Sequence, residues 1–248
     1  FRQAASSMIV QNAHRINRGE YPIVRTRDTD FFLERRESMR AAVDSVVQLV
    51  TTRLPRYLGV DPVRGIQVMA PMKRMDAGVY ALNTVLQQAI TPPAPNKREL
   101  RRGETVFREG DKVMQIRNNY QMEWEIRGIN GIVAERGMGV FNGDLGMIRS
   151  INPYTEVITV EFEEGKFADY TFKQADELEL AYATTIHKAQ GSEYPAVVIP
   201  LLGGPRMLMT RNLLYTAVTR ARKCVTIVGS DVTFQAMIGN HIEANRYT

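Results

Sequence analysis

The sequence has few of the residues that form disulfides and metal centres. Its 248 residues include one cysteine, Cys224, and three histidines. One cysteine cannot form an internal disulfide, and these scattered residues show none of the spacings at which Cys and His hold zinc. We therefore expect no structural metal, a cytoplasmic location where thiols stay reduced, and a Cys224 side chain packed in the core.

Long hydrophobic runs are also missing. No uninterrupted apolar stretch approaches the roughly 18 to 20 residues that a membrane-spanning helix requires. No basic segment followed by an apolar one opens the chain, so the sequence shows no secretory leader. These absences predict a protein without a membrane partner.

A third absence concerns phosphate binding. The run G-x-x-x-x-G-K-[ST], whose backbone amides, lysine and hydroxyl cradle nucleotide phosphates, does not occur in the sequence. We therefore expect no phosphate cradle of this kind in the chain.

The composition fits a globular protein with a mild preference for polyanions. Hydrophobic residues make up 44% of the chain, which is enough for one large domain or two modest ones. The net charge is +5 and the pI is about 9.4. Basic side chains neutralise phosphates, although basic clusters are more often solvated faces, so charge alone gives nucleic acid only slight support.

Apolar spacing predicts alternating helices and strands at both ends of the chain. Apolar residues at three- and four-residue intervals indicate helices, and short apolar runs indicate buried parallel strands. The expected helices cover residues 6–18, 40–52, 79–89 and 211–221, and the expected strands lie at 31–32, 66–70, 197–201 and 225–229. This alternation predicts an α/β fold with a parallel sheet.

The middle of the chain has a different pattern. Residues 91–105 are rich in proline and charge, which predicts a linker or extended loop. Beyond them, short alternating runs separated by Gly, Asn and Asp turns are typical of a small barrel. The motif VFNGDLG at 140–146 predicts a hairpin turn. The change of period suggests an inserted domain.

Two segments near the end of the chain carry most of the chemical information. They are AYATTIHKAQGSEYPAVVIP at 181–200 and LLYTAVTRARKCVTIVG at 213–229, each an apolar strand beside a polar cluster. They resemble motifs V and VI of superfamily-one helicases, and specifically those of the RecD-like ATP-dependent DNA helicases. FRQAASSMIVQNAHRINRGEYP at 1–22 resembles motif IV of this family, which normally follows the Walker segments. We therefore expect a carboxy-terminal fragment.

The resemblance implies a fold and a domain plan. Residues 1–103 and 181–248 would form one RecA-like motor domain, a parallel sheet with helices on both faces. Residues 104–180 would form an inserted β-barrel of the SH3-like kind. Residues 121–139 are longer than expected for the family, and Trp124 within them is either a base-stacking or a packing residue.

The resemblance also implies an activity. The full-length parent would couple hydrolysis of ATP with Mg²⁺ to 5′-to-3′ movement along single-stranded DNA. It would include an N-terminal RecA-like domain, and this chain alone would hydrolyse no ATP. The alternative is a stand-alone nucleic-acid-binding or regulatory module without turnover.

Motif VI implies an arginine finger. Arg220 in YTAVTRA would contact the γ-phosphate, because a guanidinium is always charged and suits a transferring phosphoryl group. Without the surrounding motif, Arg220 would be interpreted as a surface arginine. Arg2 of motif IV is the second expected cation at the phosphates, and Gln3 lies beside it.

Motif V implies contacts both to single-stranded DNA and to the nucleotide. Thr184, Thr185 and His187 would face single-stranded DNA, although His187 alone would be taken as a structural histidine. The nucleotide-facing side would consist of Gln190, Gly191 and Glu193, with Glu193 near the ribose.

Two further segments are candidates for DNA binding. Pro71 and Lys73 follow a predicted strand directly, and Asn83 lies in the next helix, either as a DNA-backbone donor or as an ordinary capping residue. In the middle of the chain, Asn118 and Tyr120 form either a turn with a stacking ring or merely a turn.

Overall fold

The computed structural model describes residues 7–74 and 78–242. They form two compact units. The first, called the sheet unit, comprises the chain up to Val85 and from Ala183 onward, and the second, called the inserted unit, comprises Leu86–Tyr182. Arg2 and Gln3 lie outside the described residues.

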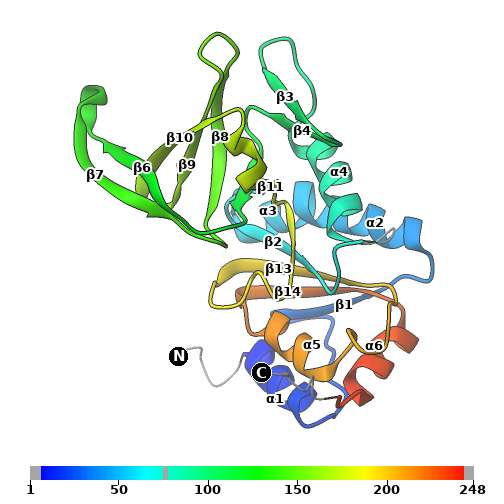
Figure 1. The fold of residues 1–248 in the computed structure, drawn as a ribbon. Coiled ribbons are helices and arrows are strands. Elements are labelled where there is room, and N and C mark those ends of the chain that lie inside the picture. Colours follow the sequence, from blue (N-terminus) through cyan, green and yellow to red (C-terminus); the bar gives the residue numbers. More distant parts are fainter. Residues whose placement is uncertain (1–6, 75–77, 243–248) are drawn as a thin grey trace. The chain divides into compact units, whose positions relative to one another are not determined.

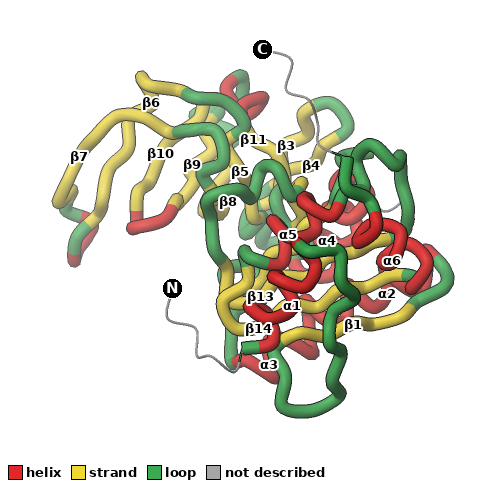
Figure 2. Tube along the Cα trace, turned by 90° about the horizontal axis from the view of Figure 1, so that it is seen from below, coloured by secondary structure: helices red, strands yellow, loops and turns green. Residues whose placement is uncertain are grey.

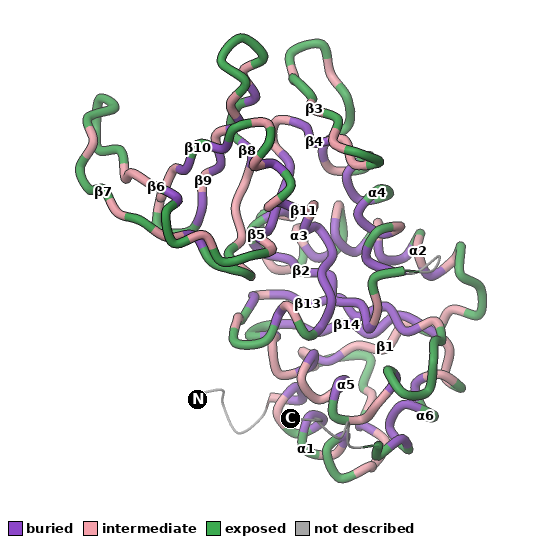
Figure 3. Tube along the Cα trace, in the orientation of Figure 1, coloured by how far each residue is buried: buried purple, intermediate pink, exposed green. Residues whose placement is uncertain are grey.

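The sheet unit contains five parallel strands in the order β1-β14-β13-β2-β12 (Figure 1). Their bounds are β1 Phe31–Arg35, β2 Ile66–Ala70, β12 Ala183–Thr185, β13 Tyr194–Leu201 and β14 Ala221–Gly229. Every residue of β2 is buried, as expected for a strand covered on both faces. Figure 3 shows mostly buried residues along β13 and β14, although Arg222 and Lys223 near the start of β14 are exposed.

Helices cover both faces of this sheet (Figures 1 and 2). One face carries α1 Met8–Asn17, α5 Arg211–Val218 and α6 Asp231–Gly239, and the other carries α2 Met39–Gln48, a π-helical turn Leu49–Arg53 and α3 Leu54–Leu58. The hydroxyls of Ser38, Thr210 and Ser230 accept hydrogen bonds from the third residue beyond them, which caps α2, α5 and α6. The predicted α/β fold is therefore present.

The helix α4 Val79–Ile90 begins next to the end of β2. The amides of Val79 and Tyr80 donate to the carbonyls of Met72 and Lys73 at 3.1 Å, so the segment after β2 is tied to the first turn of the helix. This contact fixes the backbone of the expected rim after Pro71.

The inserted unit is an antiparallel sheet of seven strands in the order β11-β5-β8-β9-β10-β6-β7. The strands are β5 Lys112–Gln115, β6 Asn119–Arg127, β7 Val133–Val140, β8 Leu145–Asn152, β9 Val157–Phe162, β10 Lys166–Thr171 and β11 Leu178–Leu180. A separate hairpin joins β3 Glu99–Arg102 to β4 Thr105–Arg108, and short 3-10 turns lie at Ile129–Gly131, Glu163–Gly165 and Gln174–Glu177. Its core includes Phe107, Met122, Ile148 and Tyr170.

The sequence-based description of this middle region needs two corrections. The expected linker 91–105 contains strand β3, which pairs with β4. The turn in VFNGDLG joins β7 to β8, but these strands do not pair, and the turn instead bonds to β5 through Gln115. The compact unit comprises Leu86–Tyr182, and the bounds 104–180 of the inserted domain stay a prediction. The strand pairings of the described part leave β11 and β7 as edges and do not close a barrel.

The structure confirms the expected burial of Cys224. Cys224 is buried, and its burial raises the pKa of the thiol to about 11. Among the described helices, none is long and apolar enough to cross a membrane.

Candidate functional site

The loop at residues 186–193 runs from the carboxyl end of one strand of the parallel sheet to the amino end of another. The two ends of the strands are called here the carboxyl edge and the amino edge of the sheet. It leaves β12 at Thr185, which pairs with Ala70 at the end of β2, and it enters β13 at Tyr194. Because β12 and β13 both run in the direction of β2, the loop passes from the carboxyl edge of the sheet to its amino edge. One segment therefore supplies side chains to both edges, each of which forms a candidate site.

Arg220 lies at the amino edge, in the turn between α5 and β14. Its main-chain amide donates to the carbonyl of Ala217, and its carbonyl accepts from Tyr194, so both neighbouring elements fix its position. The guanidinium donates through Nη1 to the carbonyl of Ser192 at 3.2 Å and through Nη2 to Thr219 Oγ1 at 3.5 Å. Its Nε is buried and has no partner among the described residues, so this cation has bonding capacity left for a ligand.

A groove of about 840 Å³ surrounds this arginine. One wall comes from α1, through Ile9, Val10, Ala13 and His14, and the rest comes from Glu193 and the segment from Tyr215 to Arg222. Glu193, which was expected near a ribose, is paired with Arg222 at 2.9 Å. The structure thus brings Arg220 and Glu193 together at one opening.

The other expected nucleotide residues lie less centrally. Gln190 and Gly191 are exposed in the loop before Ser192, and neither is among the described residues that line the groove. Gly191 has a φ of 84° with open space around the position of a Cβ. A side chain would have room there, so it is backbone conformation that favours glycine.

The carboxyl edge gathers the expected DNA contacts of motif V and the rim. Thr184 and Thr185 are mostly buried in β12, while His187 is exposed just beyond them. Thr184 Oγ1 is buried without a partner among the described residues, whereas Thr185 Oγ1 accepts from the amide of Lys188 at 3.3 Å. Because β2 and β12 end together, this polar set lies beside the segment that begins at Pro71.

On the rim itself, the three expected residues differ in exposure. Lys73 is exposed, and Pro71 is buried. Asn83 is also buried, and its amide donates to the carbonyl of Ala183 at 3.0 Å and accepts from the amide of the same residue at 2.8 Å. Asn83 therefore holds the start of β12 in place, in front of Thr184 and Thr185, and does not present a donor at the surface.

Within the inserted unit, Asn118 and Tyr120 lie just before and at the beginning of β6. Asn118 Oδ1 accepts from the amide of Asn142 at 3.0 Å. Tyr120 is 70% exposed and packs edge-to-face against Phe141 with ring centroids 5.6 Å apart. Trp124 packs against the core with Lys166 over its ring at 4.8 Å, which favours its packing role.

Four residues beside these sites were not singled out from the sequence as site residues. Arg222 pairs with Glu193, Tyr215 and His14 line the groove, and Phe141 supports Tyr120. Arg222 could have been singled out from the sequence, because this cation lies two positions after the expected arginine finger, Arg220. His14 and Tyr215 come from helices far apart in sequence, so only the packing of α1 near α5 shows their relation. No group of three possible metal ligands occurs in the described ranges.

Comparison with protein families gives two matches. The model for the SH3 domain of ATP-dependent RecD-like DNA helicases matches residues 82–162. The model for the C-terminal domain of UvrD-like helicases matches residues 180–228, which include both motif V and motif VI. The inserted unit is therefore SH3-like by family, while barrel closure stays a prediction.

Individual relatives agree with these families. The ATP-dependent RecD2 DNA helicase of Deinococcus radiodurans is 31% identical over 244 residues, covering 98% of this chain and 30% of the relative. The RecD subunit of the RecBCD enzyme of Mycobacterium tuberculosis is 37% identical over 102 residues, covering 41% of this chain and 17% of the relative. The chain thus spans less than a third of either relative.

Solved structures of Pif1 helicases share the fold. The Candida albicans protein gives a TM-score of 0.52 at 15% identity, covering 97% of this chain and 56% of that one. The Bacteroides protein in complex with ADP-AlF3 and ssDNA gives 0.51 at 15% identity, covering 96% and 52%. At this identity the likeness concerns the fold alone, and it confirms the expected RecA-like arrangement.

Proposed function

Because this chain belongs to the RecD-like helicase family, we propose that it is the C-terminal motor half of an ATP-dependent 5′-to-3′ DNA helicase. Its substrates are ATP with Mg²⁺ and single-stranded DNA. Since the chain spans 30% of its RecD2 relative, the partner RecA-like domain with the phosphate cradle belongs to the rest of the full-length parent.

The geometry of Arg220 is the observation that carries this proposal. Its main chain is fixed at the end of α5, and its guanidinium lies at a groove with an unpaired, buried Nε. A planar, permanently charged group in such a place suits the charge that develops on a transferring phosphoryl group. Arg220 is therefore the arginine finger, and Arg2, with Gln3 beside it, supplies the second cation.

The residues near Arg220 orient the nucleotide. Glu193 has a carboxylate 2.9 Å from Arg222, which keeps it at the mouth of the groove. In that position it accepts hydrogen bonds from ribose hydroxyls once the ion pair opens. Gln190 and Gly191, in the exposed loop before it, offer an amide and an accessible backbone to the same ligand.

DNA binds at the opposite edge of the sheet. Thr184, Thr185 and His187 contact the strand, and the exposed Lys73, next to Pro71, neutralises a phosphate. Asn83 acts indirectly, by holding Ala183. In the inserted unit, Asn118 positions the turn beside Tyr120, whose exposed ring stacks on a base. The loop at 186–193 joins both edges and so couples the two ligands.

The test is turnover by the full-length parent carrying Arg220→Ala. DNA-stimulated phosphate release should fall by roughly 10³ or more, the scale of arginine fingers, with a smaller loss of nucleotide affinity. Lys223→Ala, which removes an exposed cation three positions away, is the matched control and should keep its turnover. A loss of tenfold or less for Arg220→Ala would make Arg220 an ordinary surface arginine.

The isolated chain gives an independent check. It should release no phosphate from ATP, because the phosphate cradle is absent from its sequence. Phosphate release that survives purification and disappears in Arg220→Ala would contradict this division of labour. A parent that binds DNA but never hydrolyses ATP would favour the alternative, a nucleic-acid-binding or regulatory module.

A further inference from the structure

Apart from Tyr120, the hairpin of β6 and β7 carries a surface that the proposed motor function does not use. It contains the segment 121–139, and its 3-10 tip Ile129–Gly131 includes Asn130 with a φ of 69°. Ile129 is 89% exposed and Ile132 is 69% exposed at this tip. Met138 on β7 is 60% exposed. Large apolar side chains gathered on one projecting hairpin are typical of a contact surface.

The strand β7 is an edge of the seven-stranded sheet. It pairs with β6 on one side, and no described strand pairs with its other side. An edge of eight residues offers a row of backbone donors and acceptors to an extended segment of another chain.

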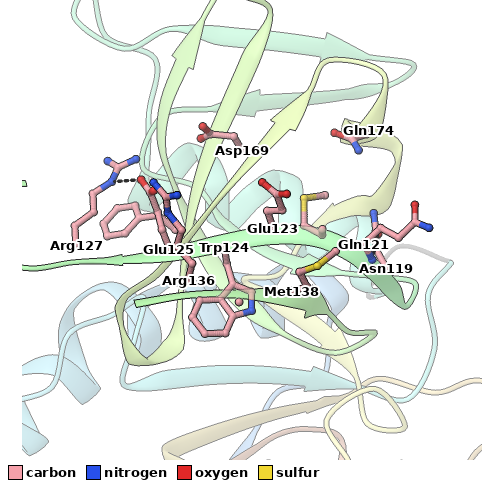
Figure 4. A pocket seen from close by; sticks show the side chains of 13 residues that line it. Asn119, Gln121, Glu123, Trp124, Glu125, Arg127, Arg136, Met138, Asp169 and Gln174 are labelled. Carbon is pink, nitrogen blue, oxygen red and sulfur yellow. Dashed lines mark hydrogen bonds and ion pairs between the residues drawn. The ribbon is translucent and has the colours of Figure 1, made fainter. Parts of the chain in front are cut away.

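A groove of about 840 Å³ follows the face of the sheet beside this edge (Figure 4). In one row of side chains across the strands β7, β6 and β10, the positive and negative charges are balanced. Arg136 on β7 and Phe167 on β10 pair with Glu125 on β6. Arg127 donates to Glu125 at 3.0 Å, and its guanidinium lies 4.6 Å from the centroid of the Phe167 ring. This row already holds the cation that its carboxylate requires.

The neighbouring row has no such balance. Met138 pairs with Glu123, and continuing the register of β6 and β10 by one pair sets Asp169 opposite Glu123. Figure 4 shows both carboxylates on the same side of the sheet. Among the described residues, no cation pairs with either, and Asp169 accepts only from the hydroxyl of Thr159. Like charges directly opposite each other destabilise a sheet, so this row favours a cation from outside.

These features identify the chemistry of the occupant. Three carboxylates against two guanidiniums repel a phosphate backbone, so the groove does not suit DNA. A lysine or arginine side chain fits, because its aliphatic stem covers Met138 and its charged end reaches the two carboxylates. The free edge of β7 accepts the backbone of the same segment.

We propose that the face and free edge of the β6–β7 hairpin bind an extended, basic segment of a partner protein by strand addition to β7. Ion pairs to Glu123 and Asp169 select the segment, and the apolar tip covers its side chains. The residues that line this site include none of the proposed nucleotide- and DNA-binding residues of the sheet unit.

The probe is a short fluorescein-labelled peptide of alternating lysine and valine. Its binding to the full 248-residue chain tests the proposal. Glu123→Lys with Asp169→Lys should weaken binding at least about tenfold. The control pair Glu104→Lys with Glu163→Lys changes the net charge equally, at exposed acids outside the groove, and should keep the affinity. Equal losses of affinity in both double variants would show that binding depends only on the net charge of the chain, and would overturn the proposal.

Amide hydrogen exchange locates the peptide without any substitution. Bound peptide should slow exchange in β7, Val133–Val140, and leave unchanged β11, Leu178–Leu180, the other edge of the same sheet. Protection absent from β7, or equal at β11, would refute strand addition. Oligothymidine binding that weakens with the substitutions at Glu123 and Asp169 would assign the groove to nucleic acid and also overturn the proposal.

Discussion

The hydroxyl of Tyr182 lies 2.8 Å from Oδ1 of Asp111, in the interior of the inserted unit. The other carboxylate oxygen of Asp111 accepts from Gln87 Nε2 at 2.7 Å and from the amide of Arg108 at 2.6 Å. Because an ionised carboxylate only accepts, Tyr182 must donate to it, and Thr91, 2.6 Å from the same hydroxyl, must donate to Tyr182. This network ties the segment that enters the unit to the segment that leaves it.

Replacing Tyr182 by Phe should destabilise the chain. It leaves one carboxylate oxygen and the hydroxyl of Thr91 without their partner in a buried place, which costs about 1–3 kcal/mol. Urea unfolding measures the loss. Tyr154→Phe, at a residue that is 89% exposed, is the control and should leave the free energy of unfolding unchanged. Equal stability of the two variants would show that the network contributes nothing.

Stability should depend on pH through Asp111. Burial raises the pKa of this carboxyl from 3.8 to about 6, against the opposing hydrogen bonds from Tyr182 and Gln87. The folded state therefore holds the proton more tightly than the unfolded state does. The contribution of the group to stability is complete below about pH 4 and is lost as the pH rises to about 6 and above.

Asp111→Asn should remove this dependence. Relative to that of the unsubstituted chain, the free energy of unfolding of the variant should increase by up to about 3 kcal/mol between pH 4 and pH 7. This amount corresponds to the difference between the two pKa values. The measurement is urea unfolding across this pH range, with Glu163→Gln as an exposed control. Parallel curves for the unsubstituted and Asp111→Asn chains would contradict the assignment.

Asn83 should be irreplaceable by an apolar residue of similar size. Asn83→Leu leaves the amide and carbonyl of Ala183 unpaired in the interior, which costs about 2–4 kcal/mol when two hydrogen bonds are lost. Thr84→Ala, at the next and exposed position, should change stability by no more than about 0.5 kcal/mol. A tolerated Asn83→Leu would mean that β12 is held by its pairing with β2 alone.

The affinity of the parent for single-stranded DNA should fall with increasing salt, and Lys73 should contribute to this dependence. Removing one phosphate contact in Lys73→Ala should lower the slope of log affinity against log salt by about 1, without sequence preference. Arg25→Ala removes an exposed cation before β1, the strand at the other side of the sheet, and should keep the slope. Fluorescence titrations with oligonucleotides measure both. An unchanged slope in Lys73→Ala would remove Lys73 from the DNA path.

Much of the sheet unit was predictable because its signals are local. The apolar run at Ile66–Ala70 has the bounds of β2, and the helix expected at 79–89 lies within α4, Val79–Ile90. Motifs V and VI located Arg220 and Glu193, which the structure places at one groove. The helix expected to reach 221 ends at Val218, because β14 begins at Ala221 and needs the intervening turn.

The misjudged parts depend on partners far away in the sequence. Residues 91–105 look like a linker because proline and charge dominate them locally, yet Glu99–Arg102 is a strand once Thr105–Arg108 lies beside it. Asn83 was weighed both as a DNA donor and as a capping residue, and its contact with Ala183, 100 positions further along the chain, had no signal in the sequence. Local propensity contains no information about either contact.

The sequence by itself determined the family and the α/β alternation and singled out the candidate residues for phosphate chemistry, since motif spacing and hydrophobic period are properties of neighbouring residues. Only the tertiary structure decided what these residues can do. It set Phe31–Arg35 beside the end of β14, paired Glu193 with Arg222 and buried Asp111 against Tyr182. These relations arise because burying apolar surface brings distant segments together, and the polar groups carried inside must then find partners there.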